Sequence, residues 1–195
     1  DERGIDVALL YDSTKVKVLD SKPLRVDLNE DNTRDILYVK TLLHERDTLH
    51  VMVCHLPSRL GGGAATEWKR LKAKQVIQHQ IDSVLHQQPQ AQIVIMGDMN
   101  DEAKNDLSGM SNQMIAMERV GQGTHKYQGI WSCLDQFYVS EKMKERCVVQ
   151  IYSPEWLLEE DTKYLDYQPN RTFVGFRYHG GYSDHLPIVL TIQNK

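Results

Sequence analysis

The chain has 195 residues, 41% of them hydrophobic, and a formal net charge of −4 at pH 7. A chain of this length and composition buries a substantial core, and we expect one domain over residues 1–195. The mild acidity excludes a general basic surface for binding nucleic acid irrespective of sequence, although a local basic patch remains compatible with it. No stretch is long and apolar enough to predict a membrane-spanning helix.

Short strand-like runs dominate the chain, each rich in aliphatic, β-branched or aromatic residues. They cover residues 5–11, 24–28, 36–43, 49–55, 92–97, 134–139, 148–152 and 186–192. One long helix interrupts them, because apolar residues, Trp68 and Leu71 among them, recur at spacings of three and four from Ala64 to His86. The cations of this helix lie mostly off the apolar stripe, and we expect them to face solvent, with phosphate binding as the alternative: Lys69, Arg70, Lys72 and Lys74.

The order of these elements favours an α/β fold. A strand, a helix and a returning strand lie within residues 49–97, which is the pattern of two strands joined by a crossover helix. The other strands are linked by segments too short for repeated crossover helices. We therefore expect a mixed sheet, or two packed sheets with helices outside, rather than a doubly wound parallel sheet.

Three cysteines, Cys54, Cys133 and Cys147, are spread along the chain without a Cys-x-x-Cys pair. An odd number at these spacings predicts neither a disulfide framework nor a structural zinc site. We expect buried free thiols.

A polar cluster, Gly97-Asp98-Met99-Asn100, closes the apolar run before it. An ionised aspartate can hold a hard cation such as Mg²⁺, and an asparagine can donate to a phosphate oxygen or orient a water without adding charge. The alternative is a strand-to-loop turn in which Asp98 and Asn100 hydrogen-bond their own backbone. The pair is a candidate centre for a metal and phosphate site.

A second polar cluster, Ser183-Asp184-His185, precedes the last apolar run. Histidine suits proton transfer near neutral pH, and a carboxylate on its far nitrogen would fix the tautomer. Neighbours along a strand point to opposite faces, so Asp135, which opens another strand, is a better candidate than Asp184 for orienting His185.

A third histidine, His55, ends its strand and is followed by Ser58 and Arg59. Arginine is well shaped to clamp phosphate, so Arg59 is a candidate for substrate binding. The alternative is a partly buried His55 whose nitrogens are bonded to backbone.

Four segments, residues 55–59, 97–101, 134–140 and 183–187, resemble in order and spacing the motifs of the endonuclease/exonuclease/phosphatase superfamily. Residues 4–11, 127–132 and 171–173 are similar to its bacterial members. The resemblance implies a two-sheet β-sandwich flanked by helices, in four α/β/β/α layers, with the site at one mouth between the sheets. It implies hydrolysis of a phosphodiester or phosphomonoester with Mg²⁺ as cofactor, and Mn²⁺ or Ca²⁺ as alternatives.

The resemblance also implies roles for single residues. His185 would help water attack phosphorus, with Asp135 orienting it, and His55 would lie over the phosphate. Asp98 and Asn100 would position the nucleophile and the phosphate. The metal would be held by carboxylates, and the substrate by polar and aromatic side chains: Asp98 and Asp184 for the metal; Arg59, Asn100, Trp131 and Arg171 for the substrate.

Members of the superfamily carry, ahead of this region, one strand with an asparagine and another ending in a glutamate that is the principal metal ligand. Nothing ahead of Gly4 supplies either, so we expect the chain to be the C-terminal two-thirds of the domain, partnered by a missing N-terminal segment. The alternative function is therefore a catalytically inactive or phosphate-binding fragment that needs this segment to act.

The substrate class stays open between nucleic acid, a small phosphodiester and a lipid headgroup. Nucleic acid would favour a rim of basic and aromatic residues, and such residues gather near the later motifs: Lys126, Tyr127, Trp131, Arg171, Phe173, Phe176, Arg177 and Tyr178. The alternative places Trp131 and Phe176 in the core.

Overall fold

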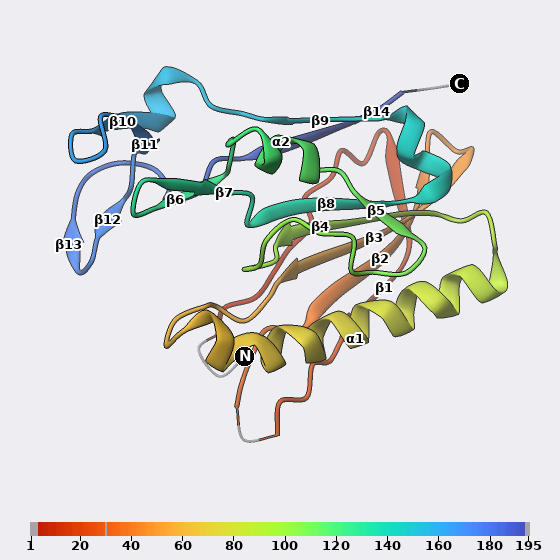
Figure 1. Cartoon of the computed structure of the whole chain (residues 1–195). Helices are drawn as coiled ribbons and strands as arrows, with labels where there is room; N and C mark the ends of the chain where they lie inside the picture. Colours follow the sequence, from red (N-terminus) through yellow and green to blue (C-terminus); the bar gives the residue numbers. More distant parts are fainter. Residues whose placement is uncertain (1–3, 30, 194–195) are drawn as a thin grey trace.

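The computed structural model describes residues 4–29 and 31–193. A mixed sheet forms the middle layer, a long helix covers one face, and a two-stranded sheet covers the other (Figure 1). None of the described helices is long and apolar enough to cross a membrane.

The central sheet has six strands in the order β1-β2-β3-β4-β8-β5. Strands β3 and β4 run parallel, and the other neighbours run antiparallel. The crossover between the parallel pair is the helix α1 (Gly63–Gln87), as predicted. The bounds are β1 (Val16–Leu24), β2 (Ile36–Leu43), β3 (Asp47–His55), β4 (Gln92–Asp98), β5 (Met110–Asn112) and β8 (Asp135–Ser140).

Each face of this sheet carries its own apolar core. On one face Ile77 and Ile81 of α1 pack with Met52 and Ile95 of the strands. The other face, which includes Val94, is covered by the pair β9 (Cys147–Ile151) and β14 (Ile188–Ile192). Packing on both faces explains why the strands in the middle of the sheet are nearly continuous apolar runs.

The predicted strands at residues 5–11 and 24–28 are wrong. Residues 5–11 form no strand, and β1 instead runs from Val16 to Leu24. It is an edge strand that exposes most of its side chains, contains Pro23 and has a register shift between Val18 and Asp20. An exposed edge lacks the apolar alternation by which a buried strand is recognised.

The prediction for the cations of α1 is also wrong in part. Arg70 and Lys74 are buried, only 3% and 6% exposed, while the predicted stripe residues Trp68 and Leu71 are exposed. Buried cations are tolerated where partners satisfy them. Arg70 donates to the carbonyl oxygens of Pro57 and Gly63, at 3.5 and 2.7 Å, and so ties α1 to the loop that follows β3.

Three short hairpins gather at one end of the molecule and were not predicted (Figure 1). They are β6 (His125–Tyr127) with β7 (Ile130–Ser132), β10 (Leu158–Asp161) with β11 (Asp166–Pro169), and β12 (Phe173–Val174) with β13 (Arg177–Tyr178). A short helix α2 (Ile115–Arg119) and 3₁₀ turns at Glu141–Arg146 and Glu155–Leu157 complete the described elements. The cysteines are free, and Cys54 and Cys133 are buried as expected, whereas Cys147 is half-buried.

Candidate functional site

The strand register brings three predicted site residues into one row. His55 at the end of β3 lies beside Asp98 at the end of β4, which in turn lies opposite Asp135 at the start of β8. These positions share one edge of the central sheet, the edge at which β3 and β4 end and β8 begins. Strand pairing alone therefore brings together three side chains that the sequence shows only at separate strand ends.

Gly97 is required for β4 to reach this edge. Its φ angle is +136°, and a Cβ atom built there would lie 1.8 Å from the carbonyl oxygen of Cys54. No other residue type fits so close to the neighbouring backbone. Asp98 therefore emerges from a strand that is in contact with β3 up to its last residues.

Asp98 and Asn100 form a fixed unit with His55. The backbone N–H of Asn100 donates to Oδ1 of Asp98 at 2.8 Å, and its side-chain Nδ2 donates to Oδ2 of Asp98 at 3.2 Å and to the Leu56 carbonyl at 3.0 Å. Nε2 of His55 lies 3.5 Å from Oδ2 of Asp98. The turn geometry expected as an alternative is present, and it holds the two side chains in place; Oδ1 of Asn100 remains as the acceptor of that amide.

Charges of both signs, from Asp135, Asp184 and His185, act on Asp98. Burial and the neighbouring Asp135 carboxylate raise the pKa of Asp98 to about 6. The His185 charge and the Asn100 N–H act in the opposite direction, and the Asp184 carboxylate adds to the rise. Asp98 therefore titrates in a partly buried setting under the charge of Asp135, whereas Asp184 is exposed.

His185 lies in hydrogen-bond contact with Asp135, the partner expected from the sequence. Nδ1 of His185 is 2.6 Å from Oδ2 of Asp135. Burial opposes protonation of the ring, but the Asp135 hydrogen bond and charge outweigh it, so the pKa of His185 lies above its ordinary value of 6.5. This contact fixes which ring nitrogen faces Asp135 and orients the imidazole.

His125 was missed by the sequence analysis. Its ring centre lies 4.8 Å from that of His185, and the two residues form an isolated antiparallel bridge. Burial, followed by the charges of His185 and Arg171, lowers the pKa of His125 to about 4. His125 sits on β6, a strand of three residues. No apolar run marks it, so the sequence offered no signal.

The donor groups suit a divalent cation in type. Asp98 and Asp184 offer the carboxylate oxygens that Mg²⁺ prefers, and the mutual repulsion of Asp98, Asp135 and Asp184 is what a cation would relieve. Among the described residues, the group of three donors closest to metal-binding geometry is His125, Asp184 and His185, whose ligand atoms lie within 4.8 Å of one another.

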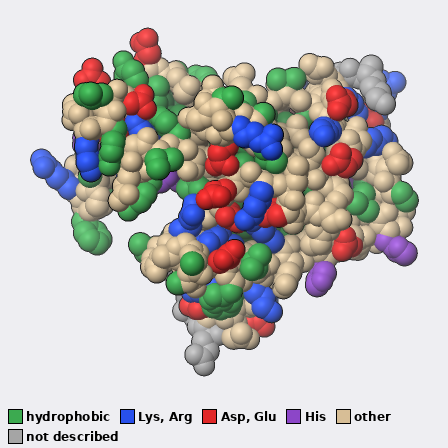
Figure 2. Space-filling view, in the orientation of Figure 1, with side chains coloured by type: hydrophobic (Ala, Val, Ile, Leu, Met, Phe, Trp, Pro, Cys, Tyr) green, Lys and Arg blue, Asp and Glu red, His purple; other side chains and the backbone are tan. Residues whose placement is uncertain are grey.

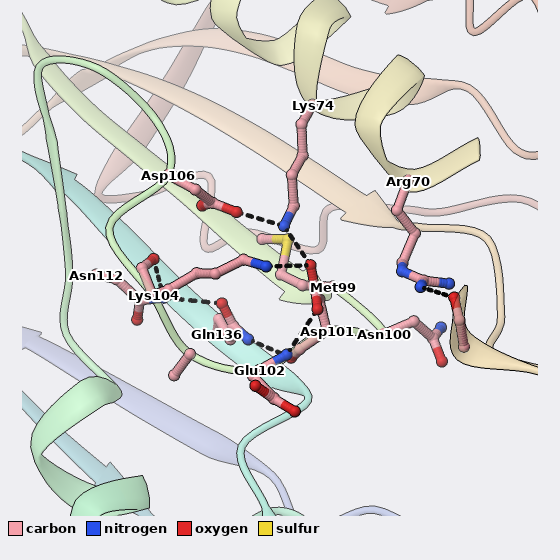
Figure 3. Close-up of polar contacts among 12 residues, drawn as sticks. Arg70, Lys74, Met99, Asn100, Asp101, Glu102, Lys104, Asp106, Asn112 and Gln136 are labelled. Atoms are coloured by element: carbon pink, nitrogen blue, oxygen red, sulfur yellow. Dashed lines mark hydrogen bonds and ion pairs between the residues drawn. The ribbon is translucent and has the colours of Figure 1, made fainter. Parts of the chain in front are cut away.

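A buried ionic network supports the loop after Asn100 (Figure 3). Nζ of Lys74 reaches from α1 to Asp101 at 2.7 Å and to Asp106 at 2.5 Å, and its side chain is 7% exposed. The loop is further held from β8, because Gln136 donates to the Asp101 carbonyl at 2.7 Å and the Tyr138 hydroxyl donates to Asp106 at 2.8 Å. The network therefore joins α1, the Asn100 loop and β8 behind the site.

The predicted substrate-binding residues other than Asn100 lie in different surroundings. Nη2 of Arg59 is 4.0 Å from a Glu102 carboxylate oxygen. Trp131 donates to Asp166 at 3.2 Å and is half-buried rather than core. Arg171 donates to the Lys126 carbonyl at 2.5 Å. Lys126 follows His125 on β6, so this bond holds Arg171 against that strand, whereas Arg59 lies in the loop between β3 and α1.

Residues 1–194 match the model of the Endonuclease/Exonuclease/phosphatase family. The chain belongs to this family. The resemblance read from the four motifs is thereby confirmed, and members of this family are phosphoesterases. Curated protein sequences give no match.

Solved structures show the same fold. Truncated Caenorhabditis elegans TDP2 has a TM-score of 0.63 and 15% identity, covering 93% of this chain and 69% of that chain. Another structure of C. elegans TDP2 has a TM-score of 0.62 and 13% identity, covering 93% of this chain and 53% of that chain. The human Nocturnin catalytic domain with bound sulfate has a TM-score of 0.53 and 14% identity, covering 92% of this chain and 62% of that chain. The chain thus spans between about half and about two thirds of these proteins, and the predicted α/β fold class is confirmed.

Proposed function

We propose that this chain hydrolyses a phosphate ester by attack of water on phosphorus, with His185 as general base. The observation that carries the proposal is the 2.6 Å contact between His185 Nδ1 and Asp135, beside the Asp98–Asn100 unit at the same sheet edge. A histidine held by a carboxylate on one nitrogen presents the other nitrogen to a proton donor.

The proposed step moves one proton from water to His185 and one from His55 to the leaving oxygen. Nε2 of His185 takes a proton from water, whose oxygen forms a bond to phosphorus while the bond from phosphorus to the leaving oxygen breaks. Asp135 stabilises the imidazolium through its contact with Nδ1. In this proposal His55 supplies a proton to the leaving oxygen. The strand register supports the role, because His55 lies on the opposite side of Asp98 from Asp135.

Asn100 acts as a positioning acceptor for the attacking water. Both N–H bonds of its side chain are directed to Leu56 and Asp98, which leaves Oδ1 to accept from the water. This differs from donation to a phosphate oxygen, the role the amide nitrogen could have had.

Asp98 and Asp184 would hold a divalent cation, Mg²⁺ in the first instance. When bound, the cation supplies positive charge that stabilises the charge developing on the phosphate. Phosphate contacts are left to Arg59 and Arg171, which lie on different loops around the site. Trp131 would form part of the wall on the Arg171 side.

The test is hydrolysis of bis(p-nitrophenyl) phosphate and of p-nitrophenyl phosphate with Mg²⁺, Mn²⁺ or Ca²⁺. We expect His185→Ala and Asp98→Ala to lower kcat/KM by at least the roughly 100-fold typical of losing a general base. The exposed His79 on α1 provides a matched control, His79→Ala, which should keep full activity. Full activity in both site variants would overturn the assignment.

A second candidate is a chain that binds phosphate without turnover. The observation that favours it is that the one three-donor group near metal-binding geometry, among the described residues, contains a single carboxylate. One or two carboxylates seldom hold a strongly hydrated ion tightly. Calorimetric titration with Mg²⁺ separates the two candidates, because micromolar binding by the chain would count against this second one.

A further inference from the structure

The β12–β13 hairpin exposes aromatic side chains that nothing in the described fold covers. Phe176 is fully exposed at 107%, and Phe173 and Tyr178 are exposed at 54% and 69%. Phe173 pairs with Tyr178 across the hairpin, and their rings meet edge to face with centres 5.6 Å apart. Burying such rings would gain free energy, so a surface of this kind marks a binding face.

The hairpin is held by its root and leaves its tip in solvent. His179 N–H donates to the Thr172 carbonyl at 2.8 Å, and Nε2 of His179 lies 2.6 Å from Glu159 on β10. Beyond these contacts the two-residue strands project away from the body of the molecule (Figure 1). The aromatic surface is therefore an anchored feature of the fold with a free outer end.

Cations alternate with these aromatics and lead to the candidate site. Arg177 lies between Phe176 and Tyr178 in the chain, and Arg171 stands at the root of the hairpin. Arg171 also donates to the carbonyl of Lys126, the chain neighbour of His125, whose ring packs on that of His185. Figure 2 shows hydrophobic side chains at this end with Lys, Arg and acidic side chains among them, and further acidic and basic side chains gathered between it and α1.

We propose that the β12–β13 hairpin is a docking surface for single-stranded nucleic acid, whose bases stack on Phe176 and Tyr178 while Arg177 and Arg171 contact its phosphates. The proposal rests on the proposed function, since the strand would run from the hairpin to the phosphoesterase site. Interleaved aromatic and basic residues are the composition that binds single strands without sequence preference.

The length of the hairpin suits a polymer rather than a small ester. Val174 follows Arg171 by three positions, and three residue steps span at most roughly 10 Å at about 3.3 Å per residue. That is the length of a few nucleotides at about 3.4 Å of rise per step. A small phosphodiester in the site would not reach the tip, whereas a strand crossing the site would.

The experiment measures binding without turnover. A fluorescein-labelled twelve-residue oligothymidine is titrated with the chain in EDTA, and anisotropy gives Kd. We expect Phe176→Ala and Tyr178→Ala each to weaken binding by roughly 5-fold or more, in keeping with the worth of one stacked base. Phe176→Tyr should restore binding, and Leu165→Ala, at an exposed apolar residue on the β10–β11 turn, should leave Kd unchanged.

The salt dependence of binding and a vesicle probe distinguish nucleic-acid binding by the hairpin from membrane binding. Arg177→Gln should reduce the slope of log K against log salt by about 0.7, the contribution of one single-strand phosphate. Unchanged oligothymidine binding in both aromatic variants would overturn the proposal, and so would binding to phosphatidylcholine–phosphatidylserine vesicles that Phe176→Ala abolishes while oligothymidine binding stays intact. Hydrolysis of bis(p-nitrophenyl) phosphate by the wild-type chain is measured in parallel, so failure of the proposed function would appear separately, as absent turnover with oligothymidine binding intact.

Discussion

Two regions border the candidate site, and they are built in opposite ways. Behind Asn100, the loop is held by Lys74, whose ammonium group is buried between Asp101 and Asp106. On the other side, the β12–β13 hairpin exposes Phe176 fully and is held at its root. Breaking the ion pairs of the first region should lower the unfolding free energy strongly, whereas removing an exposed ring of the second should lower it little.

The difference fits a division of work between the regions. Chemistry at phosphorus needs groups held to within fractions of an ångström, so Asp98 and Asn100 gain from a rigid support. Recognition of a flexible substrate tolerates an adaptable surface, because stacking on an aromatic ring does not require one fixed base. The buried charges thus lie behind the candidate groups Asp98 and Asn100, and the exposed aromatics lie where the proposed substrate would extend.

The largest effect is expected from Lys74→Met. Removing one member of a buried ion pair leaves uncompensated carboxylates, and such losses cost about 3–5 kcal/mol of unfolding free energy. Urea denaturation measures it. Lys69→Met is the matched control on the same helix, because Lys69 pairs with Asp31 at 2.9 Å in a more exposed setting and should cost about 1 kcal/mol or less. Equal losses in the two variants would contradict the contrast between the regions.

Gly97→Ala should cause the next largest loss of unfolding free energy. A Cβ at this position would clash with the Cys54 carbonyl oxygen 1.8 Å away and would require a φ angle of +136°. Strain and overpacking together should cost about 2–4 kcal/mol by thermal or urea unfolding. Gly121→Ala has an unusual φ of +78° but nothing within 4 Å, so it should cost about 1 kcal/mol. If Gly121→Ala cost as much, the clash at β3 would not be the cause.

Acid should weaken the Lys74 region by a smaller amount. Burial opposes ionisation of Asp101, but its contacts with Lys74 and Lys104 outweigh burial and hold the pKa below 3.8. A depressed carboxyl pKa stabilises the folded state above the unfolded pKa and loses that contribution as pH falls through the folded value. Stability should therefore fall below about pH 4, and the fall should be shallower in Asp101→Asn. An identical acid limb in both proteins would speak against this linkage.

The sequence predicted where the candidate residues lie on their strands better than it predicted their surroundings. His55, Asp98 and Asp135 each sit at a strand end, and strand pairing then aligns them, so local signals were enough. Lys74 was placed in solvent because helix periodicity carries no information about Asp101 and Asp106, which lie 27 and 32 residues further along the chain. A buried cation is recognised only once its distant partners are known.

The short elements escaped prediction for a related reason. The two-residue strands β12 and β13 are too brief to show alternation, and β6 is stabilised by the buried Lys126, whose ammonium group contacts Asp166 and Asp161 at 2.8 and 3.4 Å. Tertiary contacts of this kind override local propensity. His125 lies on that strand, so it was missed together with it.

The smallest effect on stability should come from Phe176→Ala. A fully exposed ring contributes little to packing, so the unfolding free energy should stay within about 0.5 kcal/mol of wild type. Tyr178→Ala loses the ring contact with Phe173, so urea denaturation should show a slightly lower unfolding free energy for Tyr178→Ala than for Phe176→Ala. A loss above about 1 kcal/mol for Phe176→Ala would mean that the hairpin packs on the fold. In that case its aromatics would serve stability, and the opposition between a buried support and an exposed recognition surface would fail.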